Sequence, residues 1–284
     1  MILVTGAAGK TGKAVVKALA AKGAPVRALI RRPEQAEALR ALGAAEVSVG
    51  GFDDVPALAQ AAAGTRAIYH ICPNVSSDEL RFARNVTTAA QSQNVRRFAY
   101  HSVLHPQIQA MTHHWEKMRT EEMLFAANLD LTVLQPTAYM QNLLGAWRDM
   151  VEDGVLRIPY PAETRLSLVD LDDVAEAAAR VLTEDGHSGA TYELAGTAPL
   201  SQTEVAATIG AVLKRDIRVE VEPVEAWEAR ARAAGMGEQR ITLAAMFRYY
   251  ARHGLVGNAN TLRWLLGREP QGLAGFASRQ AAQP

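Results

Sequence analysis

Cysteine is almost absent from this 284-residue chain, which contains only Cys72. A single thiol cannot form an internal disulfide, so a reducing, cytoplasmic location is expected. No apolar run approaches the ~20 residues that span a bilayer, and we expect no membrane association. One cysteine, and histidines without HxH or HExxH spacing, predict no metal site.

An excess of charge of either sign is also lacking, since 30 Lys and Arg residues balance 30 Asp and Glu residues. Without a net positive field, binding to nucleic acid is not expected. A charged leader is missing too, because Met1 runs directly into an apolar segment, and we expect no secretory signal. The 49% hydrophobic content allows one large core with a smaller appended lobe.

Short runs rich in Val, Ile and Leu alternate with alanine-rich helical segments through the first half of the chain. This pattern predicts βαβ units on a parallel sheet, an α/β fold of the Rossmann doubly wound class. The predicted strands are 1–5, 25–30, 46–49, 67–72, 97–103 and 131–135, and the predicted helices are 10–22, 34–42, 55–63, 78–93 and 113–127. Gly23, Gly43 and Gly64 follow helices where a left-handed residue is favoured.

Beyond about residue 137 the alternation loosens, and helices are predicted over 141–152, 201–214, 225–234 and 239–253. We expect a Rossmann domain over residues 1–140 and a smaller, interleaved C-terminal α+β lobe over 141–284 that binds a substrate or a partner. Strands at 166–169 and 191–194 flank a predicted helix, so residues 164–196 are expected to return to the Rossmann sheet. The tail after Gly275 is expected to be frayed.

A glycine-rich turn, GAAGKTG at residues 6–12, joins the first predicted strand to the first helix. Gly6 permits a tight turn, Gly9 lets the backbone approach phosphates, and Gly12 lets helix and strand pack closely. The amides of Lys10, Thr11 and Gly12 at the helix start can then receive negative charge. The motif predicts a site for a dinucleotide pyrophosphate, against the alternative of a turn that binds nothing.

The end of the second predicted strand indicates which dinucleotide is bound. An acidic residue there ordinarily binds the ribose 2′-hydroxyl, but this strand ends in Arg31 and Arg32, and no carboxylate follows before Glu34. Guanidinium groups pair with a 2′-phosphate, so NADP(H) is the predicted cofactor. The alternative is a solvated, charged turn.

With these motifs the chain resembles the NmrA-like family of atypical short-chain dehydrogenase/reductases over nearly its full length. The resemblance lies in the fragments VTGAAGKTG, ALIRRP, HSVLHPQIQAMTHHWEKMRTEE, LTVLQPTAYMQN, LVDLDDVAEAAA and LRWLLGREP. It implies a Rossmann fold with a C-terminal substrate lobe, NADP binding and one of two roles. Some members reduce quinones, dyes or similar unsaturated compounds, and others are redox-sensing regulators without demonstrated turnover.

The YxxxK pair of the enzymatic branch is altered here, because His113 stands in the tyrosine position while Lys117 is retained. The resemblance implies that Lys117 binds the nicotinamide ribose; the alternative is a surface lysine paired with Glu121. With a reference pKa of about 6.5, His113 could donate a proton near neutral pH, or it could merely cap the helix or face solvent. Ser102, at the end of the fifth strand, either faces the substrate or satisfies a local backbone group.

Further cofactor contacts follow from the family pattern and the carboxyl edge of the sheet. Where relatives often read GDFDD this chain reads GGFDD, so Phe52 is a candidate for contact with the adenine. Cys72-Pro73-Asn74 closes the fourth predicted strand at the same edge, and its backbone is expected to pass the cofactor ribose. The resemblance places the nicotinamide beside the segment after the sixth strand, where the candidates are Pro136, Tyr139 and Asn142; Tyr139 could instead be core.

An apolar pocket in the lobe would suit a flat aromatic or quinonoid substrate. Its candidate lining is His105, Met111, Trp147, Tyr160, Phe247 and Tyr250, of which we expect half to touch a ligand. Asp170, Asp172 and Asp173 precede a helix and are interpreted as cap and dipole partners. The sequence thus predicts an NADPH-dependent oxidoreductase reducing a small quinone, aromatic or other unsaturated substrate, or alternatively an NADP(H) sensor that signals to a protein partner.

Overall fold

The computed structural model describes residues 1–282 and divides the chain into two compact units. Unit 1 comprises Met1–Gln107, His113–Gln135 and Val174–Tyr192. Unit 2 comprises residues 108–112, 136–173 and the chain from Glu193 onward. The segment that follows Asp173 therefore returns to unit 1 before the chain leaves it again.

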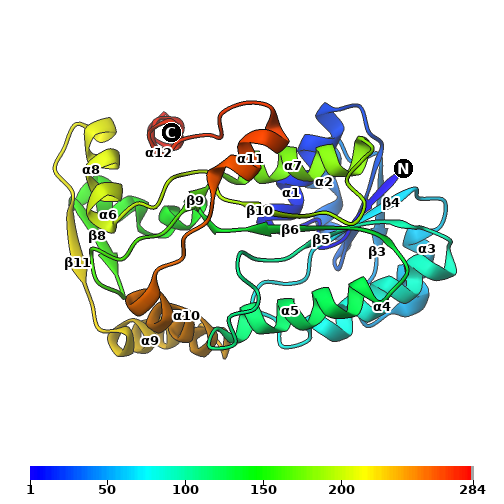
Figure 1. The fold of residues 1–284 in the computed structure, drawn as a ribbon, viewed down its shortest axis with the longest axis horizontal. Coiled ribbons are helices and arrows are strands. Elements are labelled where there is room, and N and C mark those ends of the chain that lie inside the picture. The colour runs from blue at the N-terminus through cyan, green and yellow to red at the C-terminus, as the bar shows by residue number, and fades with distance from the viewer. Residues whose placement is uncertain (283–284) are drawn as a thin grey trace. The chain divides into compact units, whose positions relative to one another are not determined.

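A seven-stranded sheet forms the centre of unit 1, in the order β10-β6-β5-β4-β1-β2-β3 (Figure 1). Its strands are β1 (Ile2–Val4), β2 (Val26–Ile30), β3 (Glu46–Val49), β4 (Ala67–His70), β5 (Arg97–His101), β6 (Asp130–Pro136) and β10 (Thr191–Leu194). The pairings from β3 through β1 to β6 are parallel. Strand order reverses between β1 and β4, which is the switch point of a doubly wound sheet, and the predicted Rossmann fold is confirmed.

Helices cover both faces of this sheet, with α3, α4 and α5 on one side and α1, α2 and α7 on the other (Figure 1). They are α1 (Lys10–Ala21), α2 (Ala36–Ala41), α3 (Val55–Ala62), α4 (Glu79–Ser92), α5 (Thr112–Phe125) and α7 (Leu171–Thr183), and a short 3-10 turn, η1 (Pro33–Gln35), precedes α2. Apolar residues at helical spacing face the sheet, as in α1, where Val15, Val16 and Leu19 are fully buried. Gly23, Gly43 and Gly64 have φ of +69°, +97° and +69°, as predicted for helix ends.

The carboxyl edge of the sheet is shorter than the sequence suggested. Strands β4 and β5 end at His70 and His101, two residues earlier than predicted. Residues 71–72 and 102–103 are therefore irregular backbone at the edge where open α/β sheets bind ligands.

Unit 2 contains two short parallel strand pairs, β7 (Ala138–Tyr139) with β9 (Leu168–Val169) and β8 (Val155–Ile158) with β11 (Arg218–Val221). Its helical segments are η2 (Met140–Ala146), α6 (Trp147–Glu152), α8 (Gln202–Leu213), α9 (Val224–Ala233), α10 (Gln239–His253), α11 (Ala259–Leu266) and α12 (Leu273–Ala281). No helix formed by residues 1–282 is long and apolar enough to cross a membrane.

Three expectations for the second half need correction. The single helix predicted over 141–152 is a 3-10 helix followed by α6, and β9 pairs with β7, so only β10 joins the main sheet. The tail predicted to fray forms α12, because Leu273, Phe276 and Ala277 are spaced to bury one helix face. Residues 283–284 of that tail lie outside the described chain.

Candidate functional site

The turn between β1 and α1 admits only glycine at two positions. Gly6 has φ of +57°, and a Cβ atom on it would lie 2.7 Å from the carbonyl oxygen of Ile71. A Cβ atom on Gly12 would lie 2.3 Å from the carbonyl oxygen of Gly6. The amide of Gly9 donates to that same oxygen at 3.0 Å, which closes the turn. The backbone geometry confirms the tight turn at Gly6 and the close packing at Gly12, while their contact with a pyrophosphate stays a prediction.

The start of α1 is left open to an anion. Its N-cap residue, Gly9, makes no side-chain cap, and its first turn holds no acidic residue. By contrast, Asp54 caps α3 by accepting from the amide of Ala57 at 3.0 Å. Gly9 and Lys10 are exposed, so the first amides of α1 remain available to phosphate oxygens. A glycine-rich turn followed by uncapped amides fits a dinucleotide pyrophosphate.

Two unpaired arginines follow β2. Arg31 and Arg32 are exposed, and neither guanidinium forms an ion pair or hydrogen bond with residues 1–282. Pro33 starts the 3-10 turn directly after them and fixes the path of the chain. Guanidinium groups that have no protein partner are free to bind a 2′-phosphate.

Buried histidines join the ends of β1, β4 and β5. The hydroxyl of Thr5 lies 2.9 Å from Nδ1 of His70 and accepts from the amide of Ile71 at 3.0 Å. The hydroxyl of Tyr69 lies 2.7 Å from Nδ1 of His101. Burial lowers the pKa of both His70 and His101 to about 3, so both rings are neutral at physiological pH.

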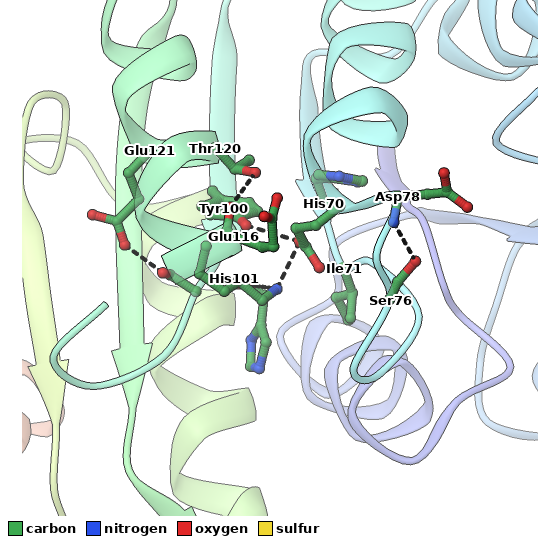
Figure 2. A network of polar contacts seen from close by, with 12 residues as sticks. His70, Ile71, Ser76, Asp78, Tyr100, His101, Glu116, Thr120 and Glu121 are labelled. Carbon is green, nitrogen blue, oxygen red and sulfur yellow. Dashed lines mark hydrogen bonds and ion pairs between the residues drawn. The ribbon is translucent and has the colours of Figure 1, made fainter. Parts of the chain in front are cut away.

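Lys117 lies in this region as a buried residue with two partners. Its side chain projects from α5, and Nζ donates to Oε1 of Glu79 at 2.8 Å and to the carbonyl oxygen of His101 at 2.7 Å. The ammonium also lies 5.0 Å from the ring centroid of Tyr100. The alternative of a surface lysine paired with Glu121 is therefore wrong. Figure 2 shows the surrounding polar network.

Glu79 is the residue that sequence reasoning missed. It is the first residue of α4 and is fully buried, and its Oε1 also accepts from the Tyr100 hydroxyl at 2.8 Å. Glu79 and Lys117 are 38 positions apart, so no local spacing could have revealed the pair. The only available signal was an acidic residue at a predicted helix start, where acids are common for other reasons.

His113 lies one helical turn before Lys117 on α5 and is half-buried. Burial, followed by the positive charge of Lys117, lowers the pKa of His113 to about 3. The expectation that its imidazolium is within reach at neutral pH is therefore wrong. Its Nδ1 is buried without a hydrogen-bond partner among residues 1–282, and the ring packs edge-on against His114.

Ser102 belongs to a separate polar cluster. Its hydroxyl donates to the Glu121 carboxylate, which also accepts from Nε2 of Gln135 at 3.0 Å. Burial raises the pKa of Glu121. The partner of the Ser102 hydroxyl is therefore a distant carboxylate and not the expected local backbone group, and its contact with a substrate stays a prediction.

Three further candidates for cofactor contact lie in unit 1, namely Phe52, Cys72 and Pro73. Cys72 is buried, and burial raises the pKa of its thiol, which is therefore protonated. Pro73 is half-buried at the same edge of the sheet. Phe52 stacks on Phe82 with ring centroids 5.2 Å apart and is only 7% exposed. Little of its surface is open to an adenine, and that contact stays a prediction, as does the ribose contact of Cys72 and Pro73.

The remaining predicted cofactor residues belong to unit 2. Pro136 is buried, Tyr139 lies opposite Val169 in the β7–β9 pair, and Asn142 is exposed on η2. Their contact with a nicotinamide stays a prediction.

Asp170 precedes α7, and Asp172 and Asp173 lie in its first turn, where cap and dipole partners are expected. Oδ1 of Asp170 accepts from the amide of Asp172 at 2.9 Å, and Asp173 pairs with Arg268 at 2.7 Å. Asp170 also pairs with Arg279. The two arginines near the C-terminus were not anticipated as partners of these carboxylates.

Comparison with known sequences and structures identifies the family of this chain. The sequence model of the NmrA-like family matches residues 1–276. The chain belongs to the NmrA-like family. NAD(P)H azoreductase of Xenophilus azovorans is 29% identical to it over 287 residues, 99% of this chain and 98% of the azoreductase. Quinone oxidoreductase 2 of Escherichia coli (strain K12) is 32% identical over 211 residues, 74% of this chain and 73% of the relative.

Solved structures agree with this NmrA-like assignment. The NADPH complex of the NADPH-dependent quinone oxidoreductase QOR2 from Escherichia coli matches with a TM-score of 0.88 at 29% identity, covering 99% of this chain and 100% of that one. The NADP(H) complex of triphenylmethane reductase from Citrobacter sp. matches with a TM-score of 0.86 at 26% identity, with the same coverage. The family resemblance read from the sequence motifs is confirmed.

Aromatic side chains in unit 2 of this NmrA-like chain gather into one cluster. The ring centroid of Tyr160 lies 5.9 Å from that of Phe247 and 6.2 Å from that of Tyr250, and Trp227, which was not predicted, lies 4.7 Å from Phe247. Two other candidates of this unit are Met111, which is fully buried, and Trp147, whose ring packs edge-on against Phe276. Their contact with a ligand stays a prediction.

A separate cavity of about 640 Å³ also lies within unit 2. Glu193, Pro199, Val256, Asn258 and Arg263 are among the residues that line it. Its volume is in the range of small-molecule sites. None of these residues was a candidate from the sequence.

Proposed function

We propose that this chain is an NADPH-dependent oxidoreductase that reduces a small quinone, azo or other unsaturated aromatic compound. The observation that carries the proposal is the uncapped start of α1 on a glycine-rich turn, together with two arginines after β2 that have no partner among residues 1–282. These features match the pyrophosphate and the 2′-phosphate of NADPH. Full-length similarity to an azoreductase and to a quinone oxidoreductase solved with NADPH supports the reaction class.

Lys117 is the residue we assign to the nicotinamide ribose. An ammonium group has three N–H donors, and two of those on Lys117 are used by Glu79 and the carbonyl of His101. The third is available to a ribose hydroxyl. The positive charge of Lys117 also favours negative charge that develops on a nearby substrate oxygen during reduction.

NADPH, when bound, supplies a hydride, and each two-electron reduction of a quinone also needs one proton to give the hydroquinone. The hydroxyl of Ser102 is committed to Glu121, and the His113 ring is neutral at neutral pH because its pKa is lowered to about 3. We therefore assign the proton to water. This chain's residues then orient the reactants and stabilise charge, without a tyrosine donor.

The substrate surface we propose is the aromatic cluster of Tyr160, Trp227, Phe247 and Tyr250. Aromatic rings pack on flat, conjugated molecules through offset or edge-on contacts. A cluster of this kind favours quinones and dyes over small aliphatic carbonyl compounds.

The second candidate is an NADP(H) sensor that binds the nucleotide and signals to a protein partner. The observation that favours it is His113, which replaces the tyrosine donor and carries no titratable proton at neutral pH, since its pKa is about 3. Turnover separates the two functions, because a sensor binds NADPH without oxidising it.

The test is a screen of NADPH oxidation against a quinone, an azo dye and a triphenylmethane dye, with NADPH and NADP binding measured by calorimetry in parallel. We expect turnover with at least one class and its loss in Lys117→Met. Tight binding with no oxidation in any mixture would overturn the reductase and favour the sensor.

A further inference from the structure

We propose that Glu79 is a positioning residue that aims the Lys117 ammonium at the nicotinamide ribose. This inference rests on the proposed function. No motif in the sequence identifies Glu79 as part of the site. On this proposal the buried Glu79–Lys117 pair contributes to binding of the nucleotide, and α4 supplies one of its two residues.

The geometry fixes the direction of the ammonium. Nζ of Lys117 is held at 2.8 Å by Oε1 of Glu79 and at 2.7 Å by the carbonyl oxygen of His101. Two bonds to acceptors on different elements leave the third N–H with one orientation. That N–H has no acceptor among residues 1–282, although the lysine is only 4% exposed.

Glu79 is itself held in place. The Tyr100 hydroxyl donates to the same Oε1 at 2.8 Å, and the residue is the first of α4, where the helix dipole favours a carboxylate. A carboxylate with two donors on one oxygen cannot swing away without losing both bonds. The position of Lys117 therefore depends on α4 and β5 together with its own helix.

Two carboxylates act on the Lys117 ammonium, Glu79 in direct contact and Glu121 through its charge without contact. The other neighbouring titratable groups are neutral. Burial lowers the pKa of three histidines to about 3, namely His70, His101 and His113. Burial also raises the pKa of the Cys72 thiol and of the Tyr100 hydroxyl, so both stay protonated. The Glu121 carboxylate on α5 is engaged by Ser102 and Gln135. Glu79 is the one carboxylate that contacts the ammonium within the described chain.

A double-mutant cycle on nucleotide affinity tests the inference. Glu79→Gln keeps the shape and one acceptor but removes the charge, and we expect it to weaken NADPH binding about tenfold, the scale of one charge-assisted hydrogen bond. Lys117→Met should weaken it by a similar factor. If Glu79 acts through the lysine, Glu79→Gln in the Lys117→Met background should change affinity by less than about twofold.

A second readout uses the protein without nucleotide. In Glu79→Gln the buried ammonium loses the carboxylate that contacts it, so we expect the midpoint of urea unfolding to fall. Glu79→Gln in the Lys117→Met background should lower that midpoint much less, because no buried ammonium is then left without its partner. Glu122→Gln, an exposed change on the same helix, is the matched control for both readouts.

The outcomes are distinct. If Glu79→Gln costs the same affinity with and without Lys117, or leaves affinity unchanged, the positioning role is overturned while the reductase proposal stands. If the unmodified protein binds no NADPH, both are overturned. If Glu79→Gln does not fold, Glu79→Asp takes its place in the double-mutant cycle. The shorter Asp carboxylate should weaken NADPH binding when Lys117 is present and should have little effect in the Lys117→Met background.

Discussion

The carbonyl oxygen of Gly6 lies so close to Gly12 that a Cβ atom on Gly12 would come within 2.3 Å of it. At Gly9 the same oxygen would be 3.3 Å from an added Cβ, and Gly9 is exposed. Two glycines of one motif therefore have different functions. Gly12 is required for the turn to fold against α1, and Gly9 keeps the approach to the helix start open.

Gly9→Val should remove the binding of NADPH and NADH, because the branched side chain occupies the space through which the pyrophosphate reaches the amides of α1. We expect at least about a hundredfold weakening by calorimetry, with the fold retained by circular dichroism. Gly12→Val is the contrast and should fail to fold, because its Cβ meets backbone atoms that cannot move aside. A folded Gly9→Val protein with unchanged affinity would show that the phosphate site lies elsewhere.

Replacing Arg31 and Arg32 together by Ala should weaken NADPH binding far more than NADH binding. Each charge-assisted bond to a phosphate contributes about 1.5–3 kcal/mol, so tenfold or more per arginine is expected. Arg40→Ala, an exposed change on α2, is the control. Equal losses for the two nucleotides would mean that the arginines do not read the 2′-phosphate.

Sequence reasoning predicted the fold well because its signals are local. Strand and helix bounds in the first half agree within about two residues, and the largest difference at a helix start is at 34–42, where Pro33 starts a 3-10 turn ahead of α2. Gly6 and Gly12, where only glycine fits, could be predicted from the heptapeptide GAAGKTG alone. α12 was missed because an apolar spacing at the end of a chain was read as fraying.

The interior of the site could not be read in the same way. Glu79 contacts Lys117 only because α4, α5 and the end of β5 come together. The pKa of His113, which burial lowers to about 3, depends on a desolvation that the His-His-Trp sequence does not reveal. Contacts between residues distant in sequence, and the burial they produce, needed the structure.

His113→Ala should change turnover by less than about threefold at neutral pH, because a ring whose pKa is about 3 has no imidazolium proton to give. Nucleotide affinity should stay nearly constant. Steady-state rates and calorimetry on the same preparation check both. A loss of about a hundredfold in turnover with intact binding would instead identify the imidazole as the proton donor.

Acid should destabilise this protein strongly. Burial lowers the pKa of His70, His101 and His113 to about 3 and that of His114 to about 4, from an ordinary 6.5. Below about pH 6.5 the unfolded chain binds protons that the folded state does not accept, so stability present above that pH is lost as the pH falls. Each ring contributes up to about 1.4 kcal/mol per pH unit. Urea unfolding at pH 8, 7, 6 and 5 checks this, and equal stability at about pH 7 and 5 would contradict it.

The most direct test of the reductase is a single turnover. The protein with one equivalent of bound NADPH is mixed anaerobically with excess quinone, and the reduced-nicotinamide absorbance and the hydroquinone are followed together. The account predicts that the absorbance is lost with one hydroquinone formed per NADPH, and that Lys117→Met slows both signals equally. Bound NADPH that keeps its absorbance in the presence of quinones, azo dyes and triphenylmethane dyes alike would contradict the account.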